Sequence, residues 1–370
     1  MIYLDNAATT FPKPDCVVDA VTRFMKESGG NPARGGHTLS VASGDTVLAC
    51  REELASLIGA SSPEQIIFTK NTTEALNLAI KGVLHKGDEV IISSMEHNSV
   101  LRSCVDLEKE GVTLKIVRAD NRGIVNPQDV SSLITDKTKL ICMIHVSNVT
   151  GSVNPVREIY AIAQRKGVLM LLDAAQSGGI LEIDTSCGDM IAFAGHKGLY
   201  GPMGTGALYI RKGITLDTLI EGGTGSFSES ALMPDLFPDR FEAGTLNACG
   251  IAGLCEGIKF IKREGAYEKE KEIGDFLIAQ MSSVKGVKII GTPKVGVVGL
   301  SLYGHDCVDI ATRLDREYNI ATRAGLHCSP MAHRTLGTIT SGLLRFSTGF
   351  FSSKEEITSA ALALEKVLKN

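Results

Sequence analysis

Short runs of aliphatic residues alternate along the first two thirds of the chain with longer segments whose apolar residues recur at helical spacing. Buried strands are predicted at 66–69, 89–93, 139–145, 168–172 and 190–194. Helices are predicted at 15–27, 41–58, 71–81, 99–110 and 156–166. Strands that alternate with helices in this way are typical of a parallel sheet covered by helices, with right-handed β-α-β connections. The sequence therefore predicts an α/β fold.

The pattern changes towards the carboxyl terminus. Two helices and then two strands are predicted there, at 248–264, 267–283, 287–290 and 297–301. Together they indicate an independent α+β unit. We therefore divide the chain into an N-terminal segment (1–14), a large domain (15–247) and a small C-terminal domain (248–370).

The predicted strand 190–194 is followed by Gly195, His196, Lys197 and Gly198, a turn that projects one amine from the end of the strand. Surface lysines usually lie among other charges, whereas Lys197 has glycines, a histidine and apolar residues as neighbours. Desolvation in such surroundings lowers the pKa of a lysine towards that of a nucleophilic amine. An ordinary turn lysine fits this short stretch equally well, so a second observation is needed.

The second observation is the predicted strand 168–172, which ends at Asp173. Ligands of open α/β sheets bind outside the carboxyl ends of the strands, so Asp173 and Lys197 are expected to face one ligand. Pyridoxal phosphate chemistry requires a lysine that forms a Schiff base and an aspartate that pairs with a pyridinium nitrogen. The pair therefore predicts pyridoxal 5'-phosphate as cofactor, with both residues catalytic.

Seven motifs, in order along nearly the whole chain, carry a family resemblance. They are LDNAATT (4–10), TKNTTEALN (69–77), EHNS (96–99), HVSNVTG (145–151), DAAQS (173–177), GHK (195–197) and RAGLHC (323–328). In these motifs the chain resembles the class V aminotransferases, specifically the cysteine desulfurase and selenocysteine lyase branch. The resemblance implies the type I, aspartate aminotransferase-like fold of pyridoxal phosphate-dependent transferases. In that fold a large domain with a mainly parallel seven-stranded sheet precedes a smaller C-terminal α+β domain.

The start of the predicted helix 71–81 is a candidate phosphate site. Exposed amides at a helix start, with the hydroxyls of Thr72 and Thr73 beside them, form an anion pocket that the helix dipole favours. Simple capping by a threonine is the same arrangement with water in place of phosphate. The resemblance favours phosphate and adds His196 as a further phosphate donor. The family often has a serine two residues before this histidine, and Ala194 at that position removes a hydroxyl contact.

Three residues near strand ends are candidate contacts of the cofactor ring. His97 could stack on a flat heterocycle and shuttle protons, although a lone histidine is more often structural. Asn148 offers a donor and an acceptor that suit the ring oxygen or the substrate carboxylate, and an Asx turn is the alternative. The resemblance implies that His97 covers the ring as a catalytic acid and base, and that Gln176 reaches the ring oxygen.

Two loop-like segments have alternative interpretations. The glycine-dense loop 29–37, which includes Arg34 and His37, is either a flexible connector or, by the resemblance, an active-site loop in which His37 contacts substrate. The segment 221–247, which is rich in Gly, Ser and Pro, is either a surface loop or a segment that crosses a dimer interface. By the resemblance it offers Gly244 and Thr245 to the partner's phosphate, which implies a homodimer.

Nine cysteines are scattered along the chain without a Cys-x-x-Cys pair or a zinc-like Cys/His cluster, so neither a metal site nor a disulfide framework is predicted. Most are expected to be reduced and buried. Cys328 lies in a polar loop instead, where Arg323 and His327 could favour its thiolate. Taken alone, it would be a packing residue. The resemblance makes it the sulfur-accepting nucleophile, on the short loop of group II desulfurases.

Arg345 interrupts an apolar, strand-like segment. An unpaired buried guanidinium is costly, so an anionic partner is expected. Its two-pronged geometry suits a substrate carboxylate, and a structural salt bridge is the alternative. The resemblance aligns Arg345 with a carboxylate-binding arginine, and Asn148, Arg323 and His37 are predicted to help bind substrate.

Composition narrows the class of protein. The 370 residues, 44% of them hydrophobic, suffice for a two-domain α/β enzyme. The net charge of −4, without long runs of one sign, argues against nucleic acid as a partner. No apolar run approaches the roughly 18 residues of a membrane span, and the start of the chain lacks a leader pattern. We therefore expect a cytoplasmic protein without membrane partners.

Together these features predict a cysteine desulfurase that converts L-cysteine to L-alanine and leaves a persulfide on Cys328. The sulfur then passes to an acceptor protein or a thiol reductant. A selenocysteine lyase would share almost every residue, whereas an aminotransferase or an eliminating cysteine lyase of the same fold would not need Cys328. A non-catalytic scaffold is disfavoured because Lys197, Asp173, His97 and Cys328 occur together.

Overall fold

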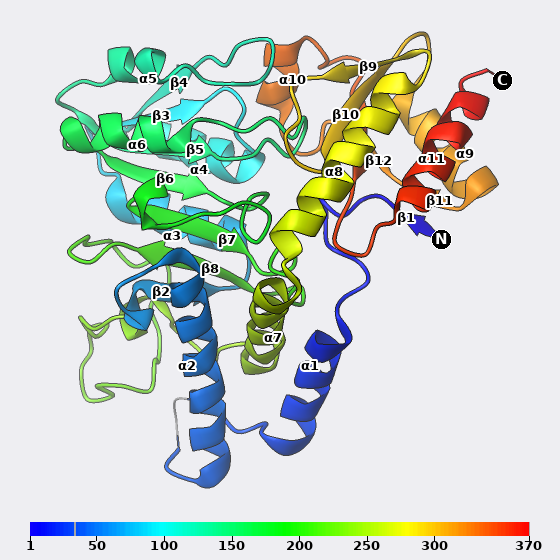
Figure 1. Cartoon of the computed structure of the whole chain (residues 1–370). Coiled ribbons are helices and arrows are strands. Elements are labelled where there is room, and N and C mark those ends of the chain that lie inside the picture. Colours follow the sequence, from blue (N-terminus) through cyan, green and yellow to red (C-terminus); the bar gives the residue numbers. More distant parts are fainter. Residues whose placement is uncertain (33–34, 370) are drawn as a thin grey trace.

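A seven-stranded sheet forms the centre of the computed structural model, which describes residues 1–32 and 35–369 (Figure 1). Its strand order is β2-β8-β7-β6-β5-β3-β4, and β8 alone runs antiparallel to its neighbours. The strands are β2 (Ile66–Thr69), β3 (Glu89–Ser93), β4 (Thr113–Val117), β5 (Thr138–Ile144), β6 (Leu169–Asp173), β7 (Met190–Ala194) and β8 (Gly206–Ile210). The predicted α/β fold with a mainly parallel seven-stranded sheet is confirmed. Arg34, which we placed in an active-site loop, lies outside the described residues.

Helices cover both faces of this sheet because its strands are apolar on both sides. In β7, for example, Ile191 and Phe193 belong to one buried cluster, whereas Met190 and Ala192 belong to the cluster on the opposite face. The first cluster contains α2 (Thr38–Ile58), α6 (Val156–Arg165) and α7 (Ala248–Glu264), and the second contains α3 (Thr72–Val83) and α4 (Asn98–Glu108). The remaining helices of this part are α1 (Asp15–Glu27) and α5 (Pro127–Leu133).

A second, antiparallel sheet of order β12-β13-β10-β9 lies beside the first (Figure 1). Its strands are β9 (Val287–Ile290), β10 (Val297–Leu302), β12 (Arg323–Gly325) and β13 (Leu343–Ser347). The helices that follow α7 are α8 (Ala266–Ser283), α9 (Cys307–Tyr318), α10 (Pro330–Leu336) and α11 (Lys354–Val367). Buried residues of α8, α9 and α11 pack with β10 and β13 in a core of their own.

The packing changes our proposal for the domain boundaries. Helix α7, which we assigned to the small domain, packs in the core of the large sheet through residues such as Leu254 and Ile258. The chain start behaves in the opposite way, because β1 (Ile2–Tyr3) pairs with β11 (Ile320–Ala321) and Leu4 lies in the core of the small sheet. We now propose a boundary at Gly265, between α7 and α8, with residues 1–7 joined to the small domain.

Local capping explains one difference in the helix limits. Helix α2 begins at Thr38, three residues before its predicted start, because Nδ1 of His37 accepts a hydrogen bond from Ser40 N at 3.3 Å.

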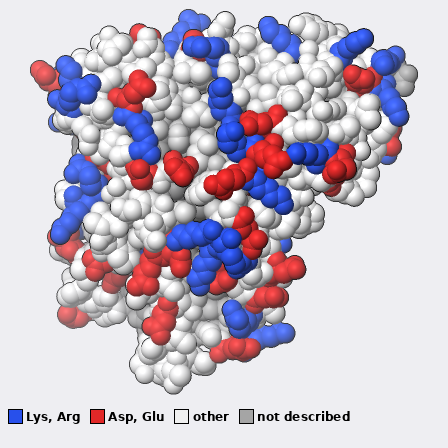
Figure 2. Space-filling view, in the orientation of Figure 1, with Lys and Arg blue, Asp and Glu red and all other residues white. Residues whose placement is uncertain are grey.

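The surface carries both signs of charge. Basic and acidic side chains are interspersed on the face shown in Figure 2. Within residues 1–32 and 35–369, no helix has the length and apolar character that a membrane crossing requires. In the same part of the chain, no three or more His, Cys, Asp or Glu side chains are grouped so that they could hold a metal ion.

Candidate active site

The carboxyl ends of β3, β5, β6 and β7 meet at one edge of the large sheet, where they and the start of α3 surround a cavity of about 230 Å³. Eight of the residues predicted for the site line it: Thr72, Thr73, His97, Asn148, Asp173, Gln176, His196 and Lys197. The other six do not: His37, Gly244, Thr245, Arg323, Cys328 and Arg345. The fold therefore brings motifs more than a hundred residues apart to one cavity.

The turn that carries Lys197 packs tightly because glycines flank the lysine. A Cβ atom on Gly195 would lie 2.1 Å from Thr205 Oγ1. A Cβ atom on Gly198 would lie 2.4 Å from the carbonyl oxygen of Gly178. Larger residues would force the turn away from its neighbours, so the two glycines hold Lys197 at the end of β7.

The N-terminal segment holds the same turn through its carbonyl oxygens. Thr10 Oγ1 donates to Lys197 O at 3.2 Å. The oxygen of His196 accepts from Lys13 Nζ at 2.9 Å and from Thr9 Oγ1 at 3.1 Å. We assigned no role to these residues from sequence, although two of them belong to the LDNAATT motif. They fix the backbone from which the Lys197 side chain projects.

The surroundings of Lys197 favour its neutral form. Burial lowers the pKa of its amine to about 8, against an opposing effect of the Asp173 carboxylate. The positive charges of Arg345 and Arg323 lower the pKa further. The lowered pKa that we predicted from the neighbouring residues is therefore confirmed. About one tenth of the amine is neutral, and hence nucleophilic, at pH 7, and about one half near pH 8.

Two buried carboxyl groups lie near the carboxyl ends of β6 and β3, the two strands that flank β5. The Ala175 amide donates to Asp173 Oδ1 at 2.9 Å, and burial raises the pKa of Asp173 while Lys197 opposes the rise. Glu96, to which we had assigned no role, accepts from Ile144 N at 2.8 Å, and burial raises its pKa to about 8. Glu96 is therefore largely protonated at neutral pH and adds little negative charge beside Asp173.

His97 has both a structural role and a place in the cavity wall. It caps α4, since its Nδ1 accepts from the Ser99 amide at 3.1 Å. Burial, together with the charge of Lys197, lowers the pKa of His97 to about 4. The ring is therefore neutral at pH 7 and carries its proton on Nε2.

The start of α3 lines the cavity with hydroxyl groups. Asn71 caps this helix, because its Oδ1 accepts from Glu74 N at 2.9 Å. The alternative prediction, that a threonine caps this helix, is therefore wrong. Thr72 and Thr73 follow the capping residue and line the cavity. His196 lines the same cavity, and its buried Nδ1 has no hydrogen-bond partner among the described residues. These groups are suited to an anion.

One amide side chain joins the cavity to the loop that carries Cys328. Asn148 Nδ2 donates to the carbonyl oxygen of His327 at 2.7 Å. Asn148 Oδ1 accepts from Ser329 Oγ at 2.9 Å, in place of the Asx turn that we considered. In addition, Asn98 N donates to Cys328 O at 2.9 Å. The residues on both sides of Cys328 are thus held against the cavity wall.

Cys328 is the one exposed residue among the nine cysteines, all of which are free. The backbone φ angles of His327 and Cys328 are 51° and 58°, left-handed values that cost about 1 to 2 kcal/mol per residue. Our expectation that His327 supports the thiolate is wrong. Its burial and the nearby charge of Arg345 lower the pKa of His327 to about 3, so the ring carries no positive charge at neutral pH.

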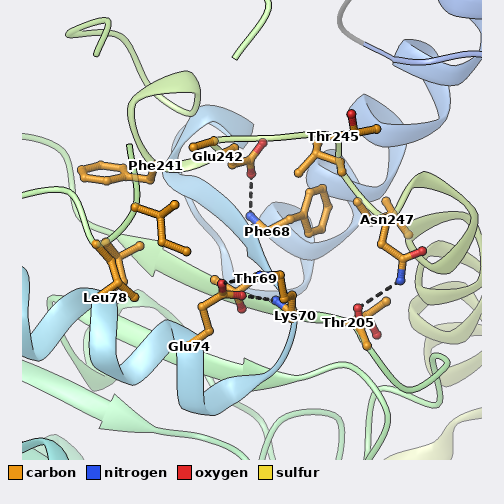
Figure 3. A pocket seen from close by; sticks show the side chains of 16 residues that line it. Phe68, Thr69, Lys70, Glu74, Leu78, Thr205, Phe241, Glu242, Thr245 and Asn247 are labelled. Atoms are coloured by element: carbon orange, nitrogen blue, oxygen red, sulfur yellow. Dashed lines mark hydrogen bonds and ion pairs between the residues drawn. The ribbon is translucent and has the colours of Figure 1, made fainter. Parts of the chain in front are cut away.

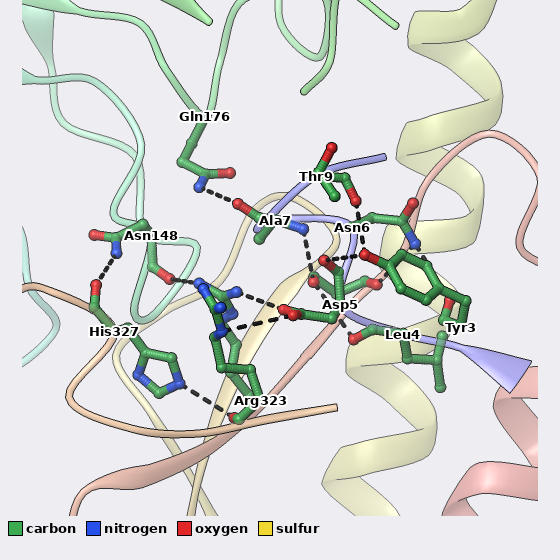
Figure 4. A network of polar contacts seen from close by, with 12 residues as sticks. Tyr3, Leu4, Asp5, Asn6, Ala7, Thr9, Asn148, Gln176, Arg323 and His327 are labelled. Carbon is green, nitrogen blue, oxygen red and sulfur yellow. Dashed lines mark hydrogen bonds and ion pairs between the residues drawn. The ribbon is translucent and has the colours of Figure 1, made fainter. Parts of the chain in front are cut away.

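Arg345 is engaged by the protein itself, in the polar network around Asp5 and Asn148 that Figure 4 shows. Its side chain is 2% exposed, and its Nη2 lies 2.7 Å from Asp5 Oδ1. Its Nη1 donates to the carbonyl oxygen of Asn148 at 2.9 Å. Arg323, which is half exposed, lies on the other side of Asp5, with 3.6 Å between its Nε and Asp5 Oδ2. The salt bridge that we considered as the alternative for Arg345 is therefore present.

Gly244 and Thr245 do not line the cavity that contains Lys197. Thr245 lines a separate cavity of about 150 Å³ together with Phe68 and Glu242 (Figure 3). Both Gly244 and Thr245 are exposed, as is His37 at the start of α2. Within a single chain, none of the three lies in the wall around Lys197.

A family model described as aminotransferase class V matches residues 2–359, almost the whole chain. The chain belongs to this family. Among curated relatives, it is 37% identical to a probable cysteine desulfurase of Methanothermobacter thermautotrophicus, over 99% of this chain and 94% of the relative. It is 36% identical to a probable cysteine desulfurase of Halalkalibacterium halodurans, over 99% of this chain and 93% of the relative.

Solved structures agree with this assignment. The apo structure of a cysteine desulfurase from Thermococcus onnurineus matches with a TM-score of 0.91 at 32% identity, over 100% of this chain and 94% of that chain. The cysteine desulfurase CsdA from Escherichia coli matches with a TM-score of 0.87 at 26% identity, over 99% of this chain and 94% of that chain. The predicted family and the type I transferase fold are confirmed.

Class V aminotransferases depend on pyridoxal phosphate, and the groups in the wall of the cavity fit this cofactor. Lys197 supplies an amine and Asp173 an anion for a pyridinium nitrogen. The unpartnered Nδ1 of His196 and the two threonines of α3 supply polar contacts for a phosphate group. Ala194 is buried outside this wall, so the effect of the missing serine hydroxyl stays a prediction.

Proposed function

We propose that this class V aminotransferase is a cysteine desulfurase that converts L-cysteine to L-alanine and keeps the sulfur as a persulfide on Cys328. The observation that supports the proposal most directly is that one side chain, Asn148, connects the Lys197 cavity with the loop that carries Cys328. Asn148 lines the cavity of Lys197 and Asp173, and its amide holds both neighbours of the exposed Cys328. The relatives named above, which are described as cysteine desulfurases, support the same activity.

In this proposal the cofactor is held by residues of the cavity wall. Asp173 would pair with its ring nitrogen, His97 would cover the ring, and Thr72, Thr73 and His196 would hold the phosphate, since all five residues line the cavity. Gln176, whose Nε2 donates to Ala7 O at 2.9 Å, would contact the ring oxygen. When bound, pyridoxal phosphate supplies the electron sink that stabilises negative charge at the substrate α-carbon.

Two side chains move protons. Lys197, neutral above its pKa of about 8, removes the proton from the α-carbon of the substrate. His97 is neutral at pH 7, and the N–H at its Nε2 can donate a hydrogen bond to the substrate; to accept a proton from the substrate thiol, its Nδ1 has to release the Ser99 amide. Arg345 binds the substrate α-carboxylate, with Asn148 and Arg323 beside it.

The sulfur transfer uses the thiolate of Cys328, which attacks the sulfur of L-cysteine. A sulfur–sulfur bond forms as the bond between Cβ and sulfur breaks, and the electron pair that remains on carbon takes up a proton. In net terms, the enzyme thiol and L-cysteine become the enzyme persulfide and L-alanine. An acceptor protein or a thiol reductant then removes the outer sulfur and restores Cys328.

We further propose that the protein is a cytoplasmic homodimer. Gly244 and Thr245 are exposed and do not line the Lys197 cavity of their own chain, so we expect any contact with phosphate to be made across an interface. His37 is exposed in the same way and would reach substrate only in the partner's site. The nine free cysteines suit a reducing compartment.

The test supplies purified protein with L-cysteine and a thiol reductant, and measures sulfide and alanine for the wild type, Cys328→Ala and Cys16→Ala. Cys16 is partly exposed on α1 and serves as the matched control. We expect equimolar sulfide and alanine from the wild type and the control. Cys328→Ala should lose both products but retain the visible absorbance of the bound cofactor.

Two results would contradict the proposal. Full activity of Cys328→Ala would make this thiol a bystander. Pyruvate in place of alanine would identify an eliminating lyase, which releases sulfide without transferring sulfur to the enzyme.

A further inference from the structure

Asp5 is a negative charge shared between two arginines next to the cavity of Lys197. Its carboxylate lies 2.7 Å from Arg345 Nη2 and 3.6 Å from Arg323 Nε (Figure 4). The side chain of Asp5 is 16% exposed, whereas that of Arg345 is 2% exposed. The charge of Asp5 also acts on Lys197, since it raises the pKa of the lysine amine. Asp5 thus belongs to the charge balance of the site, although it does not line the cavity.

The shape of the guanidinium group makes this contact important for a ligand. A carboxylate can bind two nitrogens of an arginine either along the Nε and Nη2 edge or along the Nη1 and Nη2 edge. Both edges include Nη2, the nitrogen of Arg345 that Asp5 contacts. The Nη1 group already donates to the carbonyl oxygen of Asn148, whereas the buried Nε has no partner among the described residues. A substrate carboxylate that binds two nitrogens of Arg345 therefore has to share Nη2 with Asp5 or displace it.

We propose that Asp5 is a specificity-determining residue that competes with the substrate α-carboxylate for Arg345. In the empty site it partners a guanidinium that would be costly to bury alone. In the occupied site it is a like charge beside the bound carboxylate, so it weakens the binding of amino acids. Because L-alanine has the same α-carboxylate as L-cysteine, this competition promotes product release. The inference rests on the proposed role of Arg345 as the carboxylate-binding residue.

The local backbone does not depend on the charge of Asp5. Strand β1 pairs with β11, the Leu4 carbonyl oxygen accepts from Ser347 N at 2.7 Å, and Asn6 Nδ2 donates to Ser347 O at 3.2 Å. Asparagine has the shape of aspartate, and its side-chain oxygen can still accept from Arg345 Nη2. The variant Asp5→Asn is therefore expected to fold and to differ mainly in charge.

The test measures equilibrium binding of two probes, L-alanine and ethylamine, to the holoenzyme by calorimetry. Ethylamine lacks the carboxylate and therefore reports on amine binding alone. For Asp5→Asn we expect the Kd of L-alanine to fall about tenfold through loss of a like charge within a few ångströms, while that of ethylamine changes by a clearly smaller factor, because ethylamine reports only the effect of Asp5 on Lys197. The KM for L-cysteine should fall in parallel, and kcat should fall or stay constant because release of alanine slows. Asp19→Asn, the same change of charge on the exposed face of α1, should leave all of these constants as in the wild type.

Arg345→Lys separates the inference from the proposed function on which it rests. If this variant binds L-alanine as the wild type does, Arg345 is not the carboxylate-binding residue, and both statements fail. If Arg345→Lys weakens the binding but Asp5→Asn leaves it unchanged or weakens it too, Asp5 is a structural partner only and the competition is refuted. Should Asp5→Asn fail to fold, Asp5→Ser removes the same charge with a smaller side chain, and the same outcomes apply.

Discussion

The loop that carries Cys328 is expected to depend on the side chain of Asn148. The substitution Asn148→Ala removes two buried hydrogen bonds, to His327 O at 2.7 Å and from Ser329 Oγ at 2.9 Å. Each bond contributes about 1 to 1.5 kcal/mol, so the loop loses roughly 2 to 3 kcal/mol of stabilisation. The left-handed backbone at His327 and Cys328 adds about 1 to 2 kcal/mol per residue in favour of other conformations. If the present loop conformation and an alternative one were otherwise close in energy, the loss of these hydrogen bonds alone would lower the population of the present conformation by a factor of about 30 to 150.

The assay is formation of L-alanine in a single turnover, which requires attack by Cys328. We expect Asn148→Ala to lower this rate at least tenfold, and Ser329→Ala, which removes one of the two bonds, to lower it by a smaller factor. Cofactor content, read from its visible absorbance, shows whether the cavity itself is intact. A rate within twofold of the wild type, in a variant whose free energy of unfolding has fallen by the expected amount, would refute the idea that Asn148 positions the loop.

Two further predictions concern buried charges. In cofactor-free protein, the rate at which pyridoxal phosphate reacts with Lys197 should rise with pH, with a midpoint near 8. The reason is that the amine is charged below its lowered pKa and neutral above it. A midpoint of about 10 would show that Lys197 is solvated. Arg51 forms a buried ion pair with Glu242, and its guanidinium lies 4.5 Å from the ring centre of Phe68. Arg51→Ala should lower the free energy of unfolding, measured in urea, by about 3 to 5 kcal/mol, because Glu242 remains buried without its partner. The double variant Arg51→Ala, Glu242→Gln should recover part of this loss, and no recovery would show that the arginine acts through packing alone.

Local patterns predicted five of the seven strands of the large sheet, and the chemical groups at the strand ends, but missed β4 and β8. The alternation of apolar runs with helical repeats depends on neighbouring residues, so the strands ending near Asp173 and Lys197 could be recognised from the chain alone. Since ligands of such sheets bind at the carboxyl ends of strands, the meeting of these two residues followed from the fold class. The helix limits were less certain, because capping residues such as His37 and Asn71 determine where α2 and α3 begin.

Contacts between distant segments could not be predicted in this way. Nothing near Asp5 in the sequence indicates that it pairs with Arg345, 340 residues later, or that Thr10 holds the Lys197 turn. The LDNAATT motif was the one available signal, and it indicated the family without assigning these contacts. The packing of α7 in the core of the large sheet could not be predicted for the same reason, because an amphipathic helix does not show which core it will cover.

The sequence by itself determined the class of fold and the chemical groups at the strand ends, because both depend on residue type and local spacing, and its motifs indicated the family by resemblance. Only the tertiary structure decided the charge states and partners of those groups. Burial makes His327 neutral and keeps Glu96 protonated, and a distant aspartate occupies Arg345. Desolvation and ion pairing depend on everything packed around a side chain, and that packing exists only in the folded chain.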